Sequence, residues 1–252
     1  MQPTFEQRVA LVVGGTSGIG RRVAERFAAA GARVVVGGRR TDAGREVADS
    51  ISAAGGECLF QSVDVRNMQS VAALVAAAVD RYGHLDVAFN NAGWEGTGAL
   101  TADIDEDDWS RMVDIKLNGL WRGMKYQLNA MLAGGGGAIV NMAGNWGLVG
   151  FPAYASYCAA AHGIMGLTKA AALEYAGRGI RINAVCPGAV DAPLLDRMVG
   201  GDEQAKQGFA QSLPVGRLAS VDDVADAVLW LASDSASYVN GVGLVLDGGG
   251  TA

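Results

Sequence analysis

The sequence predicts an α/β fold in which a doubly wound parallel sheet carries helices on both faces. Short apolar runs rich in β-branched residues alternate along the chain with segments whose apolar residues recur at helical spacing. The strand-like runs lack polar alternation, which is typical of strands buried on both faces. The chain has 252 residues, 50% of them apolar, so it is long enough to bury such a core, and we expect one domain over residues 1–252.

The individual elements follow from this alternation and from the glycines that interrupt it. Val9 to Val13 is an apolar run typical of a first strand, residues 14–20 form a turn, and residues 21–30 have helical spacing up to Gly31. Residues 189–214 are a long irregular stretch, and we expect them to be a lid over a ligand. Further strands are expected at 34–36, 58–63, 85–90, 138–142, 180–186 and 243–246, and further helices at 45–54, 71–82, 109–131, 156–176 and 221–232.

The composition favours a small-molecule ligand in a reducing compartment. A net charge of −6 and a pI near 4.9 argue against a nucleic-acid partner, because nucleic-acid binding normally leaves a basic surface. The three cysteines are odd in number and lack metal-ligand spacing, so we expect free thiols and no metal site. No apolar run reaches the roughly 18 residues of a membrane span, and no export signal is apparent. We therefore expect a cytoplasmic protein without a membrane partner.

A glycine-rich segment joins the first predicted strand to the first predicted helix. Glycines in this place allow a tight turn and a close approach of the backbone to a pyrophosphate, whose charge is stabilised by the helix N-terminus. Because the segment follows a strand and opens a helix, it predicts a Rossmann-like dinucleotide-binding fold. The predicted phosphate-binding residues are Gly14, Thr16, Ser17, Gly18, Ile19 and Gly20.

Four further segments, together with the glycine motif, resemble the short-chain dehydrogenase/reductase family. They are Asp64-Val65, Asn90-Asn91-Ala92-Gly93, Pro187-Gly188 and Asp247-Gly248-Gly249, and the resemblance covers essentially the whole chain. It implies a homotetramer in which helices 109–131 and 157–176 pair between subunits and the last strand joins a second interface. It also implies that Asp64 and Val65 flank the adenine and Asn91, Ala92 and Gly93 support the nearer ribose, with Pro187 and Gly188 as further cofactor-binding residues.

The end of the second strand indicates which dinucleotide is bound. A carboxylate in this place would hydrogen-bond the adenosine ribose and repel a 2′-phosphate, but the chain has Gly38 followed by Arg39 and Arg40. Arginine suits a phosphate because its planar guanidinium donates two parallel hydrogen bonds. We therefore predict NADP(H) as the cofactor, with Arg39 as a ligand of the phosphate. The alternative is a pair of solvated loop arginines.

The catalytic residues that the resemblance implies are mostly replaced. Tyr157 stands where the family has its proton-donating tyrosine, but the lysine four residues later is Ala161 and the serine thirteen residues earlier is Gly144. The family's catalytic asparagine is Lys116, and the threonine that contacts the nicotinamide carboxamide is Ala192. The four replacements all touch the nicotinamide end. A tyrosine without the lysine's charge is a poor base at neutral pH, so alcohol oxidation by the family's route is expected to fail.

Other side chains are candidates to replace the missing ones. The flexible stem of Lys116 can carry an ammonium towards Tyr157 from a different helix, or it can be a solvated lysine near Asp114. Three aromatic residues are candidates for a box around a flat or cationic ligand, with ordinary core packing as the alternative. These candidate substrate-binding residues are Trp94, Trp146 and Tyr154.

Three functions remain open on the sequence. The first is an NADP(H)-dependent oxidoreductase with a remodelled active site, which reduces an imine, an iminium or another activated electrophile because such a substrate does not need the full proton relay. The second is a non-redox cyclase, isomerase or lyase in which Tyr157, Lys116 or Asn145 orients a reactive ligand. The third is a catalytically dead homologue. Consumption of NADPH in proportion to product distinguishes the first from the others.

Overall fold

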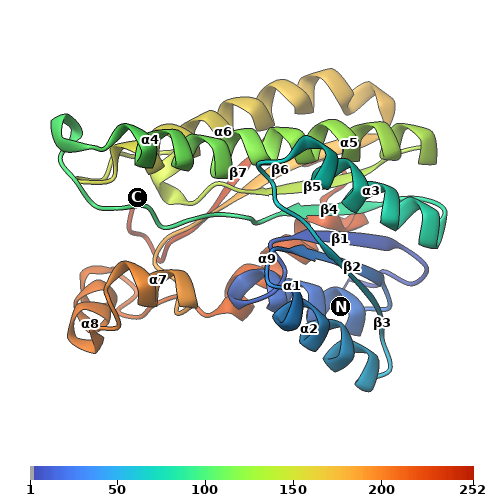
Figure 1. The fold of residues 1–252 in the computed structure, drawn as a ribbon, viewed down its shortest axis with the longest axis horizontal. Helices are drawn as coiled ribbons and strands as arrows, with labels where there is room; N and C mark the ends of the chain where they lie inside the picture. Colours follow the sequence, from blue (N-terminus) through green and yellow to red (C-terminus); the bar gives the residue numbers. More distant parts are fainter. Residues whose placement is uncertain (1–2) are drawn as a thin grey trace.

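The strands form one parallel sheet in the order β3-β2-β1-β4-β5-β6-β7 in the computed structural model, which describes residues 3–252 (Figure 1). The predicted strands and helices are present with their ends shifted by a few residues, apart from the helix expected over residues 109–131, so the predicted α/β fold is confirmed. The strands are β1 (Val9–Val13), β2 (Arg33–Gly38), β3 (Glu57–Ser62), β4 (Val87–Asn90), β5 (Gly137–Met142), β6 (Ile180–Pro187) and β7 (Gly243–Leu246).

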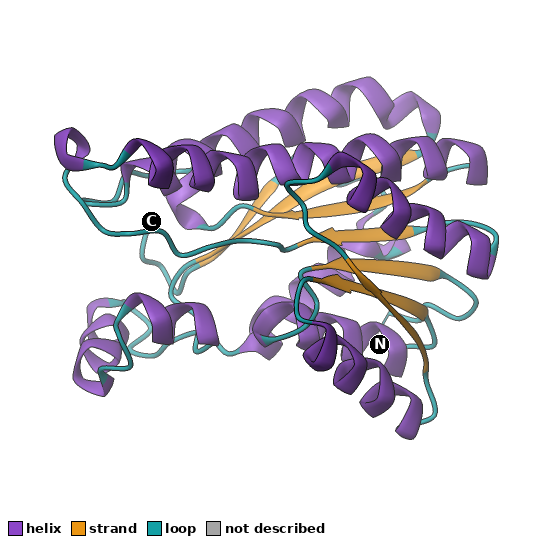
Figure 2. Cartoon of the chain, viewed as in Figure 1, coloured by secondary structure: helices purple, strands orange, loops and turns teal. Residues whose placement is uncertain are grey.

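Helices cover both faces of the sheet (Figure 2). The α-helices are α1 (Gly18–Ala29), α2 (Thr41–Ala53), α3 (Met68–Tyr82), α4 (Glu106–Met112), α5 (Gly119–Gly134), α6 (Ala155–Tyr175), α7 (Pro193–Met198), α8 (Glu203–Ser212) and α9 (Val221–Ala232). The other helices are η1 (Thr101–Asp103), η2 (Val113–Asn118), η3 (Asn145–Gly147), η4 (Ala176–Arg178) and η5 (Asp234–Ala236), of which η2 is a π-helix and the rest are 3₁₀-helices. No helix in residues 3–252 combines the length and the apolarity that crossing a membrane requires.

Strand β1 shows why the sequence lacks polar alternation. Val9, Leu11 and Val13 belong to the core beneath α3, α5 and α6, whereas Ala10 and Val12 belong to the core beneath α1, α2 and α9. All five side chains of this strand are buried, because successive residues of a strand point to opposite faces and each face is covered.

The order of the strands reverses at β1. Val13 at its end pairs with Gly37 of β2 on one side and with Asn90 of β4 on the other. The connections after β1 and β4 therefore leave the same edge of the sheet in different directions. A crevice opens at such a point, and open α/β sheets bind their ligands there.

Two predicted segments differ from the structure. The helix expected over residues 109–131 is divided into α4, the π-helix η2 and α5, and a π-helical turn is wider than an α-helical one. Residues 189–214 are not irregular, since they contain α7 and α8, which begin after Ala192 and Asp202 respectively. Pro193 at the start of α7 and the Asp202 side chain, which accepts hydrogen bonds from two backbone N–H groups of α8, favour these helices.

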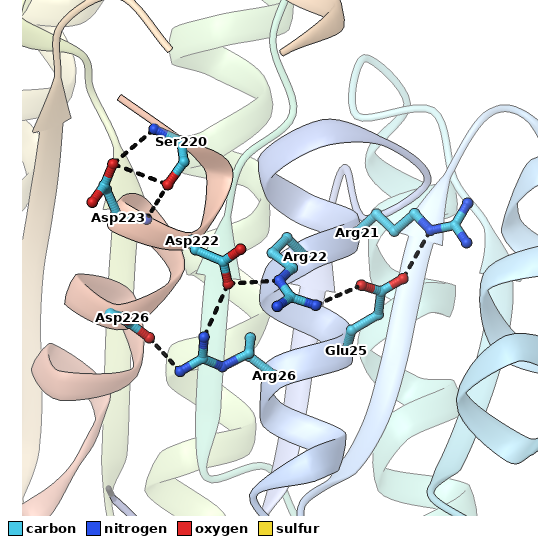
Figure 3. A network of polar contacts seen from close by, with 8 residues as sticks. All are labelled: Arg21, Arg22, Glu25, Arg26, Ser220, Asp222, Asp223 and Asp226. Atoms are coloured by element: carbon cyan, nitrogen blue, oxygen red, sulfur yellow. Dashed lines mark hydrogen bonds and ion pairs between the residues drawn. The ribbon is translucent and has the colours of Figure 1, made fainter. Parts of the chain in front are cut away.

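An ionic network joins α1 to α9 (Figure 3). The Arg22 guanidinium contacts the Asp222 carboxylate at 2.7 Å, and Arg26 bridges Asp222 and Asp226. The hydrogen bond from Arg22 lowers the pKa of Asp222. Because α1 begins at Gly18, the network fixes the helix whose N-terminus faces the crevice.

Candidate active site

A cavity of about 760 Å³ lies at the carboxyl ends of the strands and contains most of the predicted site residues. Gly20 does not line it. The predicted cofactor-binding residues that line it are Gly14, Thr16, Ser17, Gly18, Ile19, Arg39, Asp64, Val65, Asn91, Ala92, Gly93, Pro187 and Gly188. Among the predicted catalytic and substrate-binding residues, the lining contains Lys116, Asn145, Tyr157, Trp94 and Trp146, whereas Tyr154 lies outside it.

The backbone of the glycine-rich turn is shaped to hold a dinucleotide. Gly14 has φ +82°, and a Cβ added there would lie 2.7 Å from the backbone nitrogen of Ala92. A Cβ on Gly20 would lie 2.1 Å from the carbonyl oxygen of Gly14, so Gly20 lets α1 pack against the turn instead of contacting a ligand. No side chain caps α1 at Ser17, which leaves the first N–H groups of the helix directed at the cavity. These residues therefore fit the pyrophosphate of a dinucleotide.

Two arginines flank this turn at the end of β2. The Nη2 atom of Arg40 donates hydrogen bonds to Thr16 Oγ1 at 3.0 Å and to Ser17 Oγ at 2.5 Å. Arg39 and Arg40 both line the cavity. A Cβ on Gly38 would lie 2.5 Å from the Thr16 side chain, so this position has no room for a carboxylate. Arg40 is not among the cofactor ligands predicted from the sequence, although its adjacency to Arg39 pointed to it.

Asp64 holds its own counterion beside the cavity. The Arg66 guanidinium contacts the Asp64 carboxylate at 2.7 Å. The hydrogen bond from Arg66 outweighs the effect of burial and lowers the pKa of Asp64. The carboxylate therefore stays ionised at neutral pH, but its charge is compensated.

Lys116 lies directly against Tyr157. Its Nζ atom donates a hydrogen bond to Tyr157 Oη at 3.2 Å and sits 4.2 Å from the centroid of the ring. Lys116 is 3% exposed, and the π-helix η2 that carries it packs against α6, which carries Tyr157. The alternative of a solvated lysine near Asp114 is wrong, because Asp114 pairs with Arg122 at 2.7 Å. The expectation that Tyr157 lacks a neighbouring cation is also wrong, because Lys116 Nζ lies 3.2 Å from its hydroxyl oxygen.

The positions of the missing lysine and serine are not open space. Ala161 is fully buried and does not line the cavity, and a Cβ on Gly147 in η3 would lie 2.9 Å from the Ala161 carbonyl oxygen. Gly144 has φ +85° and ψ 156°, a conformation that is essentially restricted to glycine. A Cβ on Gly144 would also lie 3.3 Å from Tyr157 Oη. A serine there would require a different backbone.

The predicted aromatic box divides into two separate groups. The ring of Trp146 stacks on the ring of Phe151, with 4.1 Å between the ring centroids. It packs edge to face against Tyr157 at 5.3 Å and is tilted against Tyr154 at 5.1 Å, both measured between ring centroids. Trp94 stands apart from this group. Trp146 therefore forms a wall of the cavity beside Tyr157. Phe151, which was not among the predicted site residues, supports this wall.

Trp94 and Asn145 contact other parts of the cavity. The guanidinium carbon of Arg111 lies 4.3 Å from the centroid of the Trp94 ring, so a protein cation already covers one face of that ring. The Asn145 side chain lies near Gly188, where an added Cβ would be 3.5 Å from Asn145 Nδ2. Within residues 3–252 the Asn145 carboxamide makes no hydrogen bond, so it has donor capacity for a ligand.

An ion pair connects the predicted lid to the loop after β4. Arg197 of α7 donates to both carboxylate oxygens of Glu95, at 2.8 and 2.9 Å. Burial alone would raise the pKa of Glu95, but the bonds and charge of Arg197 lower it on balance. Both side chains line the cavity, so this pair holds α7 across its opening. This contact was not predictable from the sequence, because residues 95 and 197 are far apart in the chain.

Known proteins similar to this chain include dehydrogenases and reductases. A sequence profile of the family described as Enoyl-(Acyl carrier protein) reductase matches residues 13–251. Cyclohexanol dehydrogenase of Acinetobacter sp. (strain SE19) is 41% identical over 248 residues, which cover 98% of this chain and 96% of that protein. Cis-4-hydroxycyclohexanecarboxylate dehydrogenase of Sinomonas cyclohexanicum is 42% identical over 252 residues, with 100% of both chains covered. The crystal structure of Levodione Reductase matches with a TM-score of 0.94 and 36% identity, covering 97% of this chain and 98% of that one.

Proposed function

The chain belongs to the short-chain dehydrogenase/reductase family of oxidoreductases, whose cofactor is NAD(H) or NADP(H), and we propose that it interconverts a ring ketone and a ring alcohol with NADP(H). The proposal includes a remodelled catalytic centre in which Tyr157 transfers the proton and Lys116 replaces the family's lysine in space. The observation that carries it is the 3.2 Å hydrogen bond between Lys116 Nζ, which belongs to a buried residue, and Tyr157 Oη.

The bound dinucleotide supplies or accepts the hydride. Tyr157 donates its phenolic proton to the oxygen of the ketone in reduction and withdraws it from the alcohol in oxidation. The ammonium of Lys116 stabilises the phenolate that remains, and the burial of Lys116 strengthens this attraction because fewer water molecules screen its charge. The reason to expect alcohol oxidation to fail thus no longer holds.

Asn145 is proposed to hold the substrate oxygen. The family uses a serine hydroxyl for this purpose, but Gly144 has no side chain to offer. The next residue, Asn145, lines the cavity and carries N–H donors that are not used elsewhere in residues 3–252. A carboxamide N–H is a typical donor to a developing oxyanion.

NADP(H) is proposed because of the two arginines at the end of β2. Arg40 is fixed by Thr16 and Ser17 beside the phosphate-binding turn, and Arg39 lines the same end of the cavity. Arginine side chains in this place favour a 2′-phosphate over a bare ribose.

A ring substrate is proposed from the walls of the cavity and from the similar proteins. Trp94, Trp146, Met198 and Phe209 give the cavity flat and flexible apolar surfaces. The two similar dehydrogenases described above are named for the ring alcohols cyclohexanol and cis-4-hydroxycyclohexanecarboxylate.

Reduction of a neutral imine or an activated alkene is a second candidate. It is supported by Gly144, because such an electrophile does not develop the alkoxide that the missing serine would hold. An iminium ion fits less well, since the buried ammonium of Lys116 would repel a second positive charge.

The experiment is an assay of NADPH and NADH oxidation with cyclohexanone and with a neutral cyclic imine such as 1-pyrroline. We expect stoichiometric NADPH oxidation with the ketone, slower oxidation with the imine, and weaker use of NADH. The reverse substrate preference would favour the second candidate. Product formed without consumption of NADPH would instead indicate a non-redox cyclase, isomerase or lyase, and dinucleotide binding without turnover of any substrate would indicate a catalytically dead homologue.

We further propose a cytoplasmic homotetramer. Trp109 of α4 and Trp121 of α5 are 41% and 44% exposed, and Leu173 of α6 is also exposed, so the two helices expected to pair between subunits carry apolar surface. Strand β7 is at the edge of the sheet, and its Val245 is exposed. Burial raises the pKa of the Cys58 thiol to about 12 and that of Cys186 to about 11, which suits stable free thiols. Light scattering of the purified protein gives the subunit number.

A further inference from the structure

The lining of the cavity is cationic although the chain as a whole is acidic. Within residues 3–252, five cationic side chains and two acidic ones line it, whereas the chain has 20 Lys and Arg against 26 Asp and Glu. Both acidic groups are already paired, Asp64 with Arg66 and Glu95 with Arg197. The cationic side chains are Arg39, Arg40, Arg111, Lys116 and Arg197.

Four of these five cations have a partner or a proposed role. Arg39 and Arg40 lie at the phosphate end, Lys116 serves Tyr157, and Arg197 holds Glu95. The fifth, Arg111, forms no ion pair within residues 3–252. Arg111 is therefore a cation in the cavity that neither dinucleotide binding nor proton transfer requires.

Arg111 is nevertheless held in place. Its guanidinium stacks over the ring of Trp94 at 4.3 Å. A stacked guanidinium keeps its N–H donors at the edge of the group, where they are free to bind an oxygen anion in a bidentate way. Its acidic neighbour Glu95 is engaged by Arg197 through two hydrogen bonds and is not available as a counterion.

The position of Arg111 relates it to the catalytic pair. Arg111 is in α4 and Lys116 is in η2, which follows α4 without a break, so the two residues are five positions apart. Arg111 lies two residues before the π-helix, which begins at Val113. Both side chains line the cavity, with Lys116 buried at Tyr157 and Arg111 exposed at the opening.

We propose that Arg111, stacked on Trp94, binds a carboxylate of the substrate, so that this enzyme prefers ring ketones and alcohols that carry a carboxylate. A substrate with its oxygen at Tyr157 and its carboxylate at Arg111 spans the two cations. This inference rests on the proposed oxidoreductase function and specifies the substrate class of the same site.

The test measures binding without turnover. Cyclohexanecarboxylate and its neutral analogue cyclohexanecarboxamide are titrated into the protein saturated with NADP⁺, and the dissociation constants are measured by calorimetry. We expect the carboxylate to bind about tenfold more tightly than the amide, and Arg111→Gln to remove this preference without changing amide binding. Arg111→Lys retains the charge and is expected to retain part of the preference. Arg178→Gln is the matched control, because Arg178 stacks on Tyr175 at 5.6 Å outside the cavity.

Turnover separates this inference from the proposed function. With 4-oxocyclohexanecarboxylate as substrate, Arg111→Gln is expected to raise KM about tenfold and to leave kcat nearly unchanged, with no change in KM for the methyl ester. A carboxylate preference in binding without any turnover would sink the oxidoreductase proposal and leave the anion site standing. Equal binding of carboxylate and amide to the wild type, or a preference that survives in Arg111→Gln, would overturn the role of Arg111.

Discussion

The two ends of the cavity are built on different principles. At the phosphate end, the contacts come from backbone conformation: Gly14 has φ +82°, Gly20 has no room for a Cβ, and α1 starts without a capping side chain. At the catalytic end, side chains provide the chemistry, and Lys116 reaches Tyr157 from another helix. A site built by backbone conformation requires particular residues at particular positions in the chain. A site built by side chains can obtain the same chemical group from a different position.

The first prediction tests whether the phosphate end depends on backbone packing. Gly20→Ala is expected to lower the free energy of unfolding by about 1–3 kcal/mol and to weaken NADPH binding by about 100-fold, because its Cβ would lie 2.1 Å from the Gly14 carbonyl oxygen. Chemical denaturation and a fluorescence titration of NADPH measure the two effects. Gly208→Ala is the control, since that helical glycine has no atom within 4 Å of an added Cβ and the change should stabilise the protein by about 1 kcal/mol. Tight NADPH binding by Gly20→Ala would refute the backbone argument.

The second prediction concerns the side chains at the phosphate end. Arg40→Ala is expected to weaken NADPH binding by about 10- to 100-fold and to leave NADH binding almost unchanged, because only NADPH carries the 2′-phosphate. Titrations of both dinucleotides give the ratio. An equal loss for NADPH and NADH would mean that Arg40 supports the turn through Thr16 and Ser17 and does not recognise the phosphate.

The third prediction concerns the ion pair that holds α7. Glu95→Gln is expected to raise KM for the ketone by up to about fivefold, because a partly exposed ion pair contributes at most about 1 kcal/mol. Since the folded-state pKa of Glu95 is lowered, the pair is intact above the ordinary value of about 4.3 and is lost as pH falls through the lower folded-state value. KM of the wild type should therefore be flat near neutral pH and rise only in acid. A similar rise of KM in Glu203→Gln on α8 would show that the effect is not specific to this pair.

The fourth and smallest effect is predicted for the network between α1 and α9. Asp222→Asn is expected to lower the free energy of unfolding by no more than about 1 kcal/mol, because the ion pairs of Asp222 with Arg22 and Arg26 are partly exposed. The lowered pKa of Asp222 means that this contribution persists at pH values above about 4 and is lost as pH falls further. Denaturation of the variant and the wild type at neutral pH and in acid measures it. A loss that is equal at both pH values would contradict the ionic origin.

The difference between the two ends also explains how far the sequence could be interpreted. The fold and the phosphate turn were predictable because hydrophobic periodicity and glycine spacing report on the backbone directly. Ala161 and Gly144 correctly marked changed positions, but the sequence could not show that η3 fills the space beside Ala161 or that Gly144 adopts a conformation restricted to glycine. The π-helix η2, which carries Lys116, has no signature in hydrophobic periodicity.

Contacts between distant segments were likewise not predictable. Glu95 and Arg197 are separated by 102 positions, and only the folded chain brings them together. The stacking of Arg111 on Trp94 joins α4 to the loop after β4 in the same way. Charge and aromaticity indicated candidate residues, but not their partners.

The most direct test of the relocated lysine is a double-mutant cycle on the single-turnover rate of ketone reduction at saturating NADPH. Tyr157→Phe and Lys116→Gln are each expected to lower the rate by about 10²- to 10⁴-fold, and the double variant should be no slower than Tyr157→Phe alone, because the two side chains act as one unit. Lys125→Gln, which removes a lysine that lies 5.8 Å from the Trp121 ring outside the cavity, should leave the rate unchanged. Losses that multiply in the double variant, or a wild-type rate in a folded Lys116→Gln, would contradict the proposal.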